Sequence, residues 1–243
     1  MVAAPQSSWV VTWEKLPGDF ILDDEPVDNI NQPAIAAALT ESLELAERLP
    51  AQALVMTNYG LCATVNGKTV VKAPDWGYVP EICVPRDEVT RSYTPQLQGD
   101  FPAIVMEFLS DTEGGEYSIK PTYPPGKWFF YEQVLRVPHY IIFEPDRGLL
   151  EAYALNDAGQ YQLRAPDAQQ RFWIDQLGLA LGVWQGSRGN RTGYWLRWWT
   201  EQGDILPWGK EQAEQERQRA EQERQRAERL AAQLRAAGLE PEQ

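Results

Sequence analysis

The pattern of apolar and polar positions begins, after an irregular start, with a helical period. Apolar side chains recur at three- and four-residue spacing across residues 33–49, which places them on one face of an α-helix. Pro33 suits the first turn of such a helix, and we expect Pro50 to end it. The predicted buried face comprises Ile35, Ala38, Leu39, Ser42, Leu43, Ala46 and Leu49.

Strand-like runs follow this helix. Residues 54–57 and 61–65 are short and apolar, and the second run enters an Asn66-Gly67 pair, which favours the tight turn of a β-hairpin. We predict that the hairpin continues along residues 68–72. Asp75 should then lie just past the end of a sheet strand.

Further apolar runs alternate with loop-like segments. Residues 80–102 and 110–126 are rich in proline, glycine and polar residues, which predicts loops. Residues 103–109 between them have the length of a buried strand, with Glu107 as the one charged member. The remaining predicted core elements are a short helix at residues 127–135, a strand at 139–143, and a hairpin of residues 149–155 and 161–164. The pattern therefore predicts a mixed α/β fold.

Residues 166–208 carry aromatic side chains along short β-like segments. Aromatic side chains supply much of the buried area of most folds, whereas the basic residues that a nucleic-acid surface needs are sparse here. We therefore interpret this region as a packing layer over the core. The aromatic residues concerned are Phe172, Trp173, Trp184, Trp195, Trp198, Trp199 and Trp208.

The C-terminal segment contains a seven-residue repeat, residues 213–219 recurring as residues 220–226. Strong helix formers and Glu/Arg pairs predict a solvated single helix. A coiled coil needs apolar a and d positions, and here only alanine recurs until Leu230. We therefore predict one domain at residues 1–209 and a charged, heptad-like helical tail at residues 210–243. A weak coiled coil that forms a homo-oligomer, or a helix that binds a protein partner, is the alternative role of the tail.

The composition indicates one substantial core, since the 243 residues are 43% hydrophobic and include ten tryptophans. The chain lacks any run of about 18 apolar residues, and its N-terminus does not resemble a signal peptide. We therefore expect a soluble, cytoplasmic protein that does not bind membranes. In that compartment we expect Cys62 and Cys83 to be core or loop residues rather than a disulfide or a zinc site.

The net charge of −13, from 22 basic and 35 acidic residues, has the wrong sign for a protein that holds nucleic acid mainly through its phosphates. This charge is evidence against a strong DNA binder. It is compatible with a phosphodiesterase, because a bound cation can invert the local field where carboxylates cluster. Contacts with nucleic acid should therefore be local or metal-assisted.

Two carboxylates and one lysine flank the predicted strands in an order that suggests chemistry. Asp75 and Glu107, together with the Phe108 carbonyl, can present oxygen ligands to one divalent cation. Lys127, at the start of the following helix, can direct its ammonium to an attacking water or a phosphate. Tyr131 shares a helix face with this lysine. Each feature also has a structural interpretation, as a turn residue, a paired strand carboxylate or a solvated lysine.

This order of motifs resembles the Uma-two family of putative restriction endonucleases, within the PD-(D/E)XK nuclease superfamily. The resemblance covers roughly residues 20–165. The motifs that carry it are Pro74-Asp75, the strand from Ile104 to Ser110, Lys127 with Tyr131, the segment from Val137 to Pro145, and the Leu-Glu-Ala-Tyr strand at residues 150–153.

The resemblance implies a restriction-endonuclease-like core, in which helices flank a central mixed β-sheet. It implies Asp75 and Glu107 as metal ligands, Mg²⁺ or Mn²⁺ as cofactor, and DNA as substrate. It also implies that Lys127 is the superfamily lysine, moved from strand to helix, because Leu109 occupies the position two residues after Glu107.

Two features depart from the family pattern, and one family position has two candidates in this chain. The loop before Lys127 is longer than usual, so Lys120 competes with it for the lysine role. Asn31-Gln32-Pro33 stands where the family offers a histidine. The family's N-terminal acidic residue corresponds to either Glu25 or Asp28.

Two functions are consistent with the sequence. The first is a metal-dependent endonuclease that hydrolyses DNA phosphodiester bonds. The second is a catalytically inactive member of the fold that acts as a protein-interaction module. His139 is the only histidine and aligns with a variable family position, so we expect it to be structural.

Overall fold

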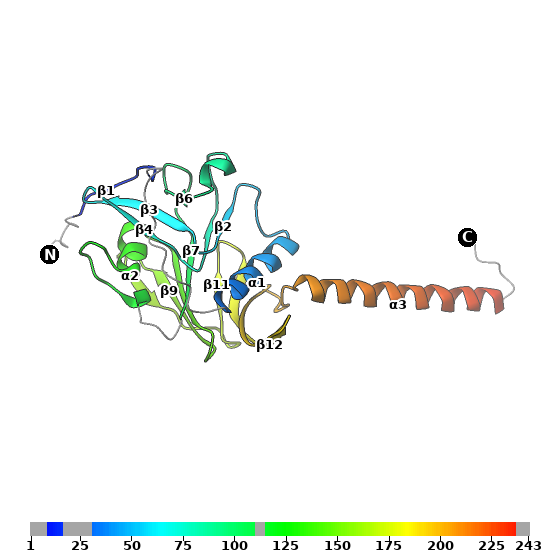
Figure 1. Cartoon of the computed structure of the whole chain (residues 1–243). Helices are drawn as coiled ribbons and strands as arrows, with labels where there is room; N and C mark the ends of the chain where they lie inside the picture. Colours follow the sequence, from blue (N-terminus) through cyan, green and yellow to red (C-terminus); the bar gives the residue numbers. More distant parts are fainter. Residues whose placement is uncertain (1–8, 17–30, 110–114, 237–243) are drawn as a thin grey trace.

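The structure is a computed structural model that describes residues 9–16, 31–109 and 115–236. A six-stranded mixed sheet in the order β10-β9-β8-β7-β5-β2 forms its centre (Figure 1). β7 and β8 run parallel, and the other neighbouring strands are antiparallel. The strands of this sheet are β2 (Leu54–Met56), β5 (Trp76–Val79), β7 (Ile104–Phe108), β8 (His139–Glu144), β9 (Leu149–Leu155) and β10 (Tyr161–Leu163).

A second sheet contains the predicted hairpin. β3 (Gly60–Val65) and β4 (Lys68–Lys72) pair antiparallel around Asn66 and Gly67, both of which have positive φ angles. β1 (Val11–Thr12) and β6 (Ser92–Tyr93) extend this sheet on β3. The hairpin prediction is therefore confirmed.

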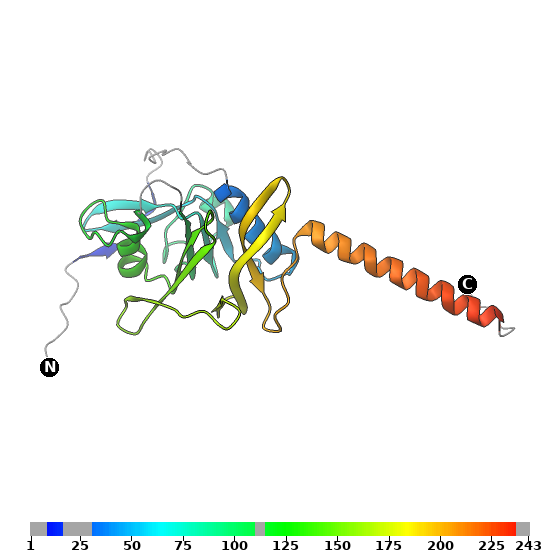
Figure 2. The ribbon, with the colours of Figure 1, turned by 90° about the horizontal axis from the view of Figure 1, so that it is seen from below.

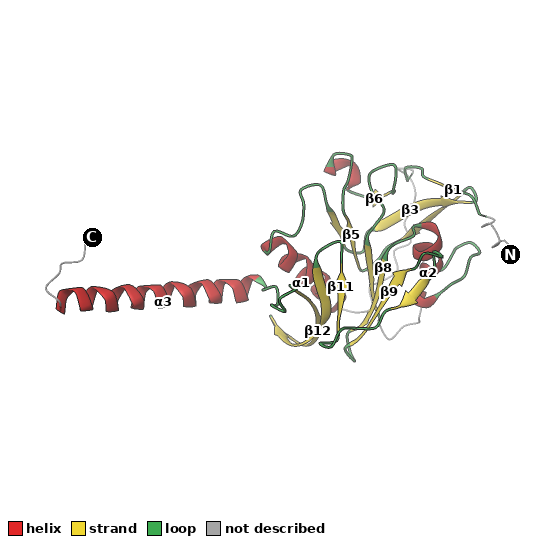
Figure 3. Cartoon of the chain, turned by 180° about the vertical axis from the view of Figure 1, so that it is seen from behind, coloured by secondary structure: helices red, strands yellow, loops and turns green. Residues whose placement is uncertain are grey.

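Two hydrophobic clusters cover the two faces of the central sheet. One joins it to α1 (Asn31–Leu45) and to a three-stranded sheet of β11 (Arg171–Ile174), β12 (Leu179–Arg188) and β13 (Arg191–Trp199). The other joins it to the β1-β3-β4-β6 sheet, to α2 (Lys127–Phe129) and to the π-helical turn Phe130–Val134 that continues α2. Figure 3 shows the helices and strands of these layers from behind. The mixed α/β prediction is confirmed.

The prediction that the first helix extends to residue 49 was wrong, because α1 ends at Leu45. Glu47 takes a positive φ of 52°, and the backbone N–H of Arg48 reaches back to the Leu43 carbonyl at 2.9 Å. This hydrogen bond, with that from Glu47 N–H to the Glu44 carbonyl, is the pattern of a Schellman motif. The Schellman motif therefore ends the helix five residues before Pro50.

The Trp-rich region forms longer strands than the short segments that we predicted, since β12 has 10 residues and β13 has 9. Its packing role is confirmed. Trp198 donates its indole N–H to the Leu39 carbonyl and lies 6.0 Å from Trp76 between ring centroids. Trp208 donates to the Ala38 carbonyl. These indoles cover the side of α1 that faces β13.

The tail is a single helix, α3 (Gly209–Ala236), and none of its residues is buried. Figures 1 and 2 show it projecting away from the sheets. Its first turn is fixed by Glu211, which accepts two hydrogen bonds from the buried guanidinium of Arg197 at 3.2 and 2.7 Å and one from the Trp208 N–H. The predicted exposed helix is confirmed up to Ala236, and residues 237–243 of the predicted tail lie outside the described residues.

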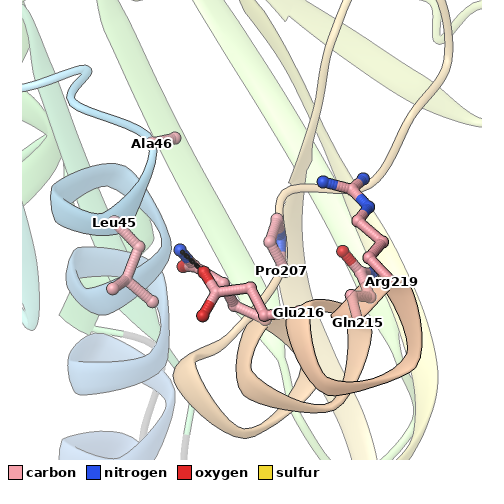
Figure 4. Close-up of a pocket in the computed structure, with 7 residues that line it drawn as sticks. Leu45, Ala46, Pro207, Gln215, Glu216 and Arg219 are labelled. Atoms are coloured by element: carbon pink, nitrogen blue, oxygen red, sulfur yellow. Dashed lines mark hydrogen bonds between the residues drawn. The ribbon is translucent and has the colours of Figure 1, made fainter. Parts of the chain in front are cut away.

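The junction between α1 and α3 contains a hollow, shown in Figure 4, with Leu45 and Ala46 on the α1 side and Pro207, Glu216 and Arg219 on the α3 side. It lies at the C-terminal end of α1. The two cysteines are free thiols, Cys62 buried and Cys83 exposed, as expected. None of the helices in the described ranges has the length and apolar character needed to cross a membrane.

Candidate active site

Glu107 owes its position to the alternation of side chains along β7. Ile104, Met106 and Phe108 face the α1 side of the sheet, whereas Val105 faces the α2 side. Glu107 shares the face of Val105, so its carboxylate points toward α2. Only 1% of the residue is exposed. A carboxylate buried among apolar side chains needs specific partners.

Asp75 reaches the same place from the neighbouring strand. It comes directly before β5, a strand that we did not predict, and β5 pairs antiparallel with β7 through Trp76 opposite Met106. Oδ2 of Asp75 accepts a hydrogen bond of 2.6 Å from the Phe108 N–H. Asp75 therefore lies at this end of the central sheet because of β5. The predicted strand at residues 68–72 belongs to another sheet.

Two side chains of the following helix bind the two oxygens of Glu107. Lys127 Nζ lies 2.9 Å from Oε2, and the Tyr131 hydroxyl donates to Oε1 at 2.9 Å. The predicted common face of Lys127 and Tyr131 is confirmed. Asp75, Glu107 and Lys127, which are far apart in the sequence, therefore converge at one point.

Burial decides the protonation of the two carboxyls. It raises the pKa of Asp75 to about 6, against the opposing effects of the Phe108 N–H and of Lys127. It raises the pKa of Glu107 to about 8, where the Lys127 ammonium opposes the shift and the Asp75 carboxylate adds to it. Burial alone would lower the pKa of Lys127, but the carboxylates around it, Glu107 first, hold that pKa above its ordinary value. Lys127 is therefore a cation at neutral pH.

The competing lysine is remote from these contacts. Lys120 is exposed, and none of the hydrogen bonds or ion pairs of the described residues joins its ammonium to Glu107. Lys127 is thus the lysine that the fold brings to the carboxylate. Glu25 and Asp28, between which we left the N-terminal acidic position open, lie outside the described residues.

The Phe108 carbonyl, our third predicted metal ligand, already has a partner. Gln32, at the start of α1, donates its side-chain N–H to this oxygen at 2.5 Å. A carbonyl oxygen has two lone pairs, so this bond leaves one acceptor position. Sequence reasoning noted residues 31–33 only as a departure from a family pattern and missed this contact.

Glu116 is a second residue that sequence reasoning missed. It lies in the short 3₁₀ turn Gly115–Tyr117, and its Oε1 is 3.4 Å from Lys127 Nζ. The only signal in the sequence was the unusual length of the loop, which gives no position for any residue in it. In the described part of the chain, no three His, Cys, Asp or Glu side chains form a ready set of metal ligands.

His139 lies away from the site. It stands at the start of β8 opposite Ile104, whereas Glu107 pairs with Ile142 near the other end of the strand. Burial lowers its pKa, and Arg164 lowers it further, so the ring is neutral at physiological pH. Its position agrees with the structural role that we expected.

One family model matches this chain. The model is that of Uma2, described as "putative restriction endonuclease", and it matches residues 28–189, which include Asp75, Glu107 and Lys127. Curated proteins offer no match. The mixed sheet flanked by helices is the restriction-endonuclease-like core that we expected. Because the match spans more than half of the 243 residues, the chain belongs to the Uma2 family of restriction-endonuclease-like proteins.

Proposed function

We propose that this protein is a Mg²⁺- or Mn²⁺-dependent endonuclease that hydrolyses DNA phosphodiester bonds. The observation that carries the proposal is the convergence of Asp75, Glu107 and Lys127, with Nζ 2.9 Å from Oε2 of Glu107 and Phe108 N–H 2.6 Å from Oδ2 of Asp75. The family match supports the nuclease class.

The residues present fit a hard divalent cation. Asp75, Glu107 and the Phe108 carbonyl offer oxygen atoms, which Mg²⁺ and Mn²⁺ prefer. The Asp75 carboxylate raises the pKa of Glu107, so the two negative charges repel each other, and a cation between them would relieve that repulsion. When bound, such a cation lowers the pKa of a coordinated water and neutralises charge on a phosphate.

Lys127 contributes as a charged donor rather than as a base. In the metal-free site the carboxylates around it, Glu107 first, hold its pKa above the ordinary value, so the ammonium is protonated at neutral pH. It can stabilise the negative charge that develops on the phosphate and orient the attacking water. Tyr131 holds Oε1 of Glu107 and thereby fixes the direction of the carboxylate.

The acidic surface shapes the expected contact with DNA. A net charge of −13 opposes long-range attraction to phosphates, so the substrate must be held by local contacts and by the cation. Activity should therefore depend on the metal. Without the metal, repulsion between the acidic protein and DNA is strongest at low ionic strength, so binding of DNA should be weak there.

The experiment that tests the proposal is nicking of supercoiled plasmid in Mn²⁺. Wild type, Asp75→Ala and Lys127→Ala are purified side by side and checked for folding by circular dichroism. Cleavage by wild type that both variants lose supports the proposal. Folded wild-type protein that leaves plasmid and linear DNA intact in both Mg²⁺ and Mn²⁺ contradicts it.

An interaction module is the second candidate function. The observation that favours it is α3, which is exposed along its length and anchored at one end by the Arg197–Glu211 pair. Calorimetric titration with Mn²⁺ separates the two candidates. Binding by wild type that is lost in Asp75→Ala favours the nuclease, and absence of binding in both favours the module.

A further inference from the structure

Glu116 approaches Lys127 from a segment outside the core motif. It belongs to residues 115–126, which connect to α2 and are called here the 115–126 loop. Oε1 of Glu116 lies 3.4 Å from Nζ, on a lysine that Glu107 already binds. The exposed fractions of the side chains are 16% for Glu116 and 28% for Lys127. The pair is thus partly withdrawn from water, unlike an ordinary surface ion pair, which contributes little.

Strands of the central sheet hold the first turn of this loop. The Tyr140 hydroxyl, from β8, donates to the backbone carbonyl of Glu116 at 2.8 Å. The Tyr117 hydroxyl donates to Oε2 of Glu151, on β9, at 3.0 Å. Tyr117 also stacks on Trp128 of α2. Three separate elements therefore determine where Glu116 lies.

The end of the loop is equally constrained. The Phe129 N–H reaches the Ser118 carbonyl at 3.3 Å, and the Gly126 N–H reaches the Lys120 carbonyl at 2.9 Å. A Cβ atom at Gly126 would lie 2.0 Å from the Ser118 carbonyl oxygen, so the two chain segments touch where only glycine fits. The loop is therefore packed against α2, and this packing places Glu116 next to Lys127.

The geometry of an ammonium group explains what this contact achieves. Nζ has three N–H donors, and in the described part of the chain two of them are directed to Glu107 and Glu116. One carboxylate would leave the group free to rotate about a single contact. Two carboxylates from different segments fix its orientation, and the third donor is then directed away from both.

We propose that Glu116 is a positioning residue of this site, which holds the Lys127 ammonium so that its third N–H is available to the substrate phosphate. The proposal deepens the proposed function and rests on it for the identity of the substrate. The positioning itself depends only on contacts within the protein. A lysine ordered before the substrate arrives loses less side-chain entropy on binding it.

The first test measures the order of Lys127 without any substrate. The chain has only six lysines, so protein labelled with ¹³C-lysine gives a simple spectrum, and Lys127→Arg identifies the signal. In a held side chain the two Hε protons have different chemical shifts, and in a freely rotating one they coincide. Because Glu107 still binds Lys127 in every variant, we expect the largest shift difference in wild type, a smaller one in Glu116→Gln, and the smallest in Glu116→Ala.

Glu144→Ala is the matched control, because Glu144 also forms an ion pair, with Arg147, but does not touch Lys127. Its Lys127 signals should match those of wild type. Unchanged Lys127 signals in Glu116→Ala would overturn the proposal. This measurement does not depend on catalysis. The positioning of Lys127 can therefore be refuted while the nuclease activity is confirmed, and the nuclease activity can be refuted while the positioning is confirmed.

The second test measures plasmid cleavage at saturating Mn²⁺. Mispositioning of one catalytic group should lower kcat roughly tenfold in Glu116→Ala with little change in KM, and Glu116→Gln should restore part of the loss. Tyr140→Phe, which removes the tether to the Glu116 backbone and no charge, should lower kcat by a smaller factor. A kcat equal to that of wild type in Glu116→Ala would overturn the proposal.

Discussion

Tyr131 donates its hydroxyl hydrogen to Oε1 of Glu107 at 2.9 Å, and both side chains are buried. The contact joins the helix that carries Lys127 to the strand that carries the glutamate. It completes the set of partners that a buried carboxylate requires, since Lys127 binds the other oxygen. The most buried group of the candidate site is thus held by two donors one helical turn apart.

Replacing Tyr131 by Phe should destabilise the protein. The substitution removes a hydrogen bond to a charged or partly charged acceptor and leaves Oε1 of Glu107 without a partner in the core, at a cost of about 2 kcal/mol. Urea unfolding followed by tryptophan fluorescence measures the change in the free energy of unfolding. Tyr153→Phe is the control, because Tyr153 donates to the less buried Glu151. Equal losses of unfolding free energy in the two variants would contradict the claim that buried Glu107 needs Tyr131 as a partner.

The affinity for Mn²⁺ should rise with pH. Without a cation, burial raises the pKa of Asp75 to about 6 and that of Glu107 to about 8, above their ordinary values of 3.8 and 4.5. The native state therefore holds these protons more tightly than the unfolded state, and the cost of burying the ionised carboxyls grows as pH rises through this range. A cation must displace the protons, so its affinity should increase at least about tenfold between pH 6 and pH 8.

Isothermal titration calorimetry in two buffers of different ionisation enthalpy measures both the affinity and the protons released. We expect proton release near pH 7 in wild type. Asp75→Asn should bind Mn²⁺ more weakly and release fewer protons. An affinity that is constant across this pH range would exclude Asp75 and Glu107 as the groups that meet the cation.

The two lysines of the loop and helix should differ sharply in cleavage assays. Lys127→Ala removes the ammonium 2.9 Å from Glu107 and should lower kcat by about 100-fold or more. Lys120→Ala removes an exposed side chain and should change kcat less than about twofold. Plasmid nicking rates at saturating Mn²⁺ compare them. A larger loss in Lys120→Ala would assign the lysine role to Lys120.

Removing Glu211 should destabilise the protein through Arg197. The side chain of Arg197 is 0% exposed, and Glu211 is its carboxylate partner. Glu211→Ala leaves a buried guanidinium with the Leu206 carbonyl and the Trp208 ring, at a cost of about 3 kcal/mol. Glu221→Ala, at an exposed ion pair of α3, should cost less than about 0.5 kcal/mol. Thermal or urea unfolding compares the two, and similar effects would refute the anchoring role.

Truncation of α3 should leave the oligomeric state unchanged. The helix is exposed and its repeat lacks an apolar seam, so we expect the full chain to sediment as a monomer. A stop codon after Gln215 removes most of the helix and retains Glu211 as the partner of Arg197. Analytical ultracentrifugation of both proteins measures the mass. A dimer that the truncation dissociates would assign the tail to self-assembly.

Local patterns were enough to predict several elements of this protein. The Asn66-Gly67 pair favours a tight turn whose twist matches the strands of a hairpin. The apolar run around Glu107 has the length of a buried strand, which predicts β7. The four-residue spacing of Lys127 and Tyr131 predicts that they share a face, and both bind Glu107. Each of these inferences depends on neighbours within a few residues of one another.

Other features depend on contacts that no local pattern encodes. The register between β5 and β7 places Asp75 against the Phe108 N–H, and β5 is too short and too buried to reveal itself by alternation. Gln32 lies 76 residues from the carbonyl that it binds. The position of Glu116 depends on Tyr140 of β8 and on the contact between Tyr117 and Glu151 of β9. The sequence alone was therefore enough to predict the candidate site residues and most of the strands and helices that carry them. Which of them meet at the site was decided by strand pairing and loop packing, because those interactions join residues whose separation in sequence leaves no periodic signal.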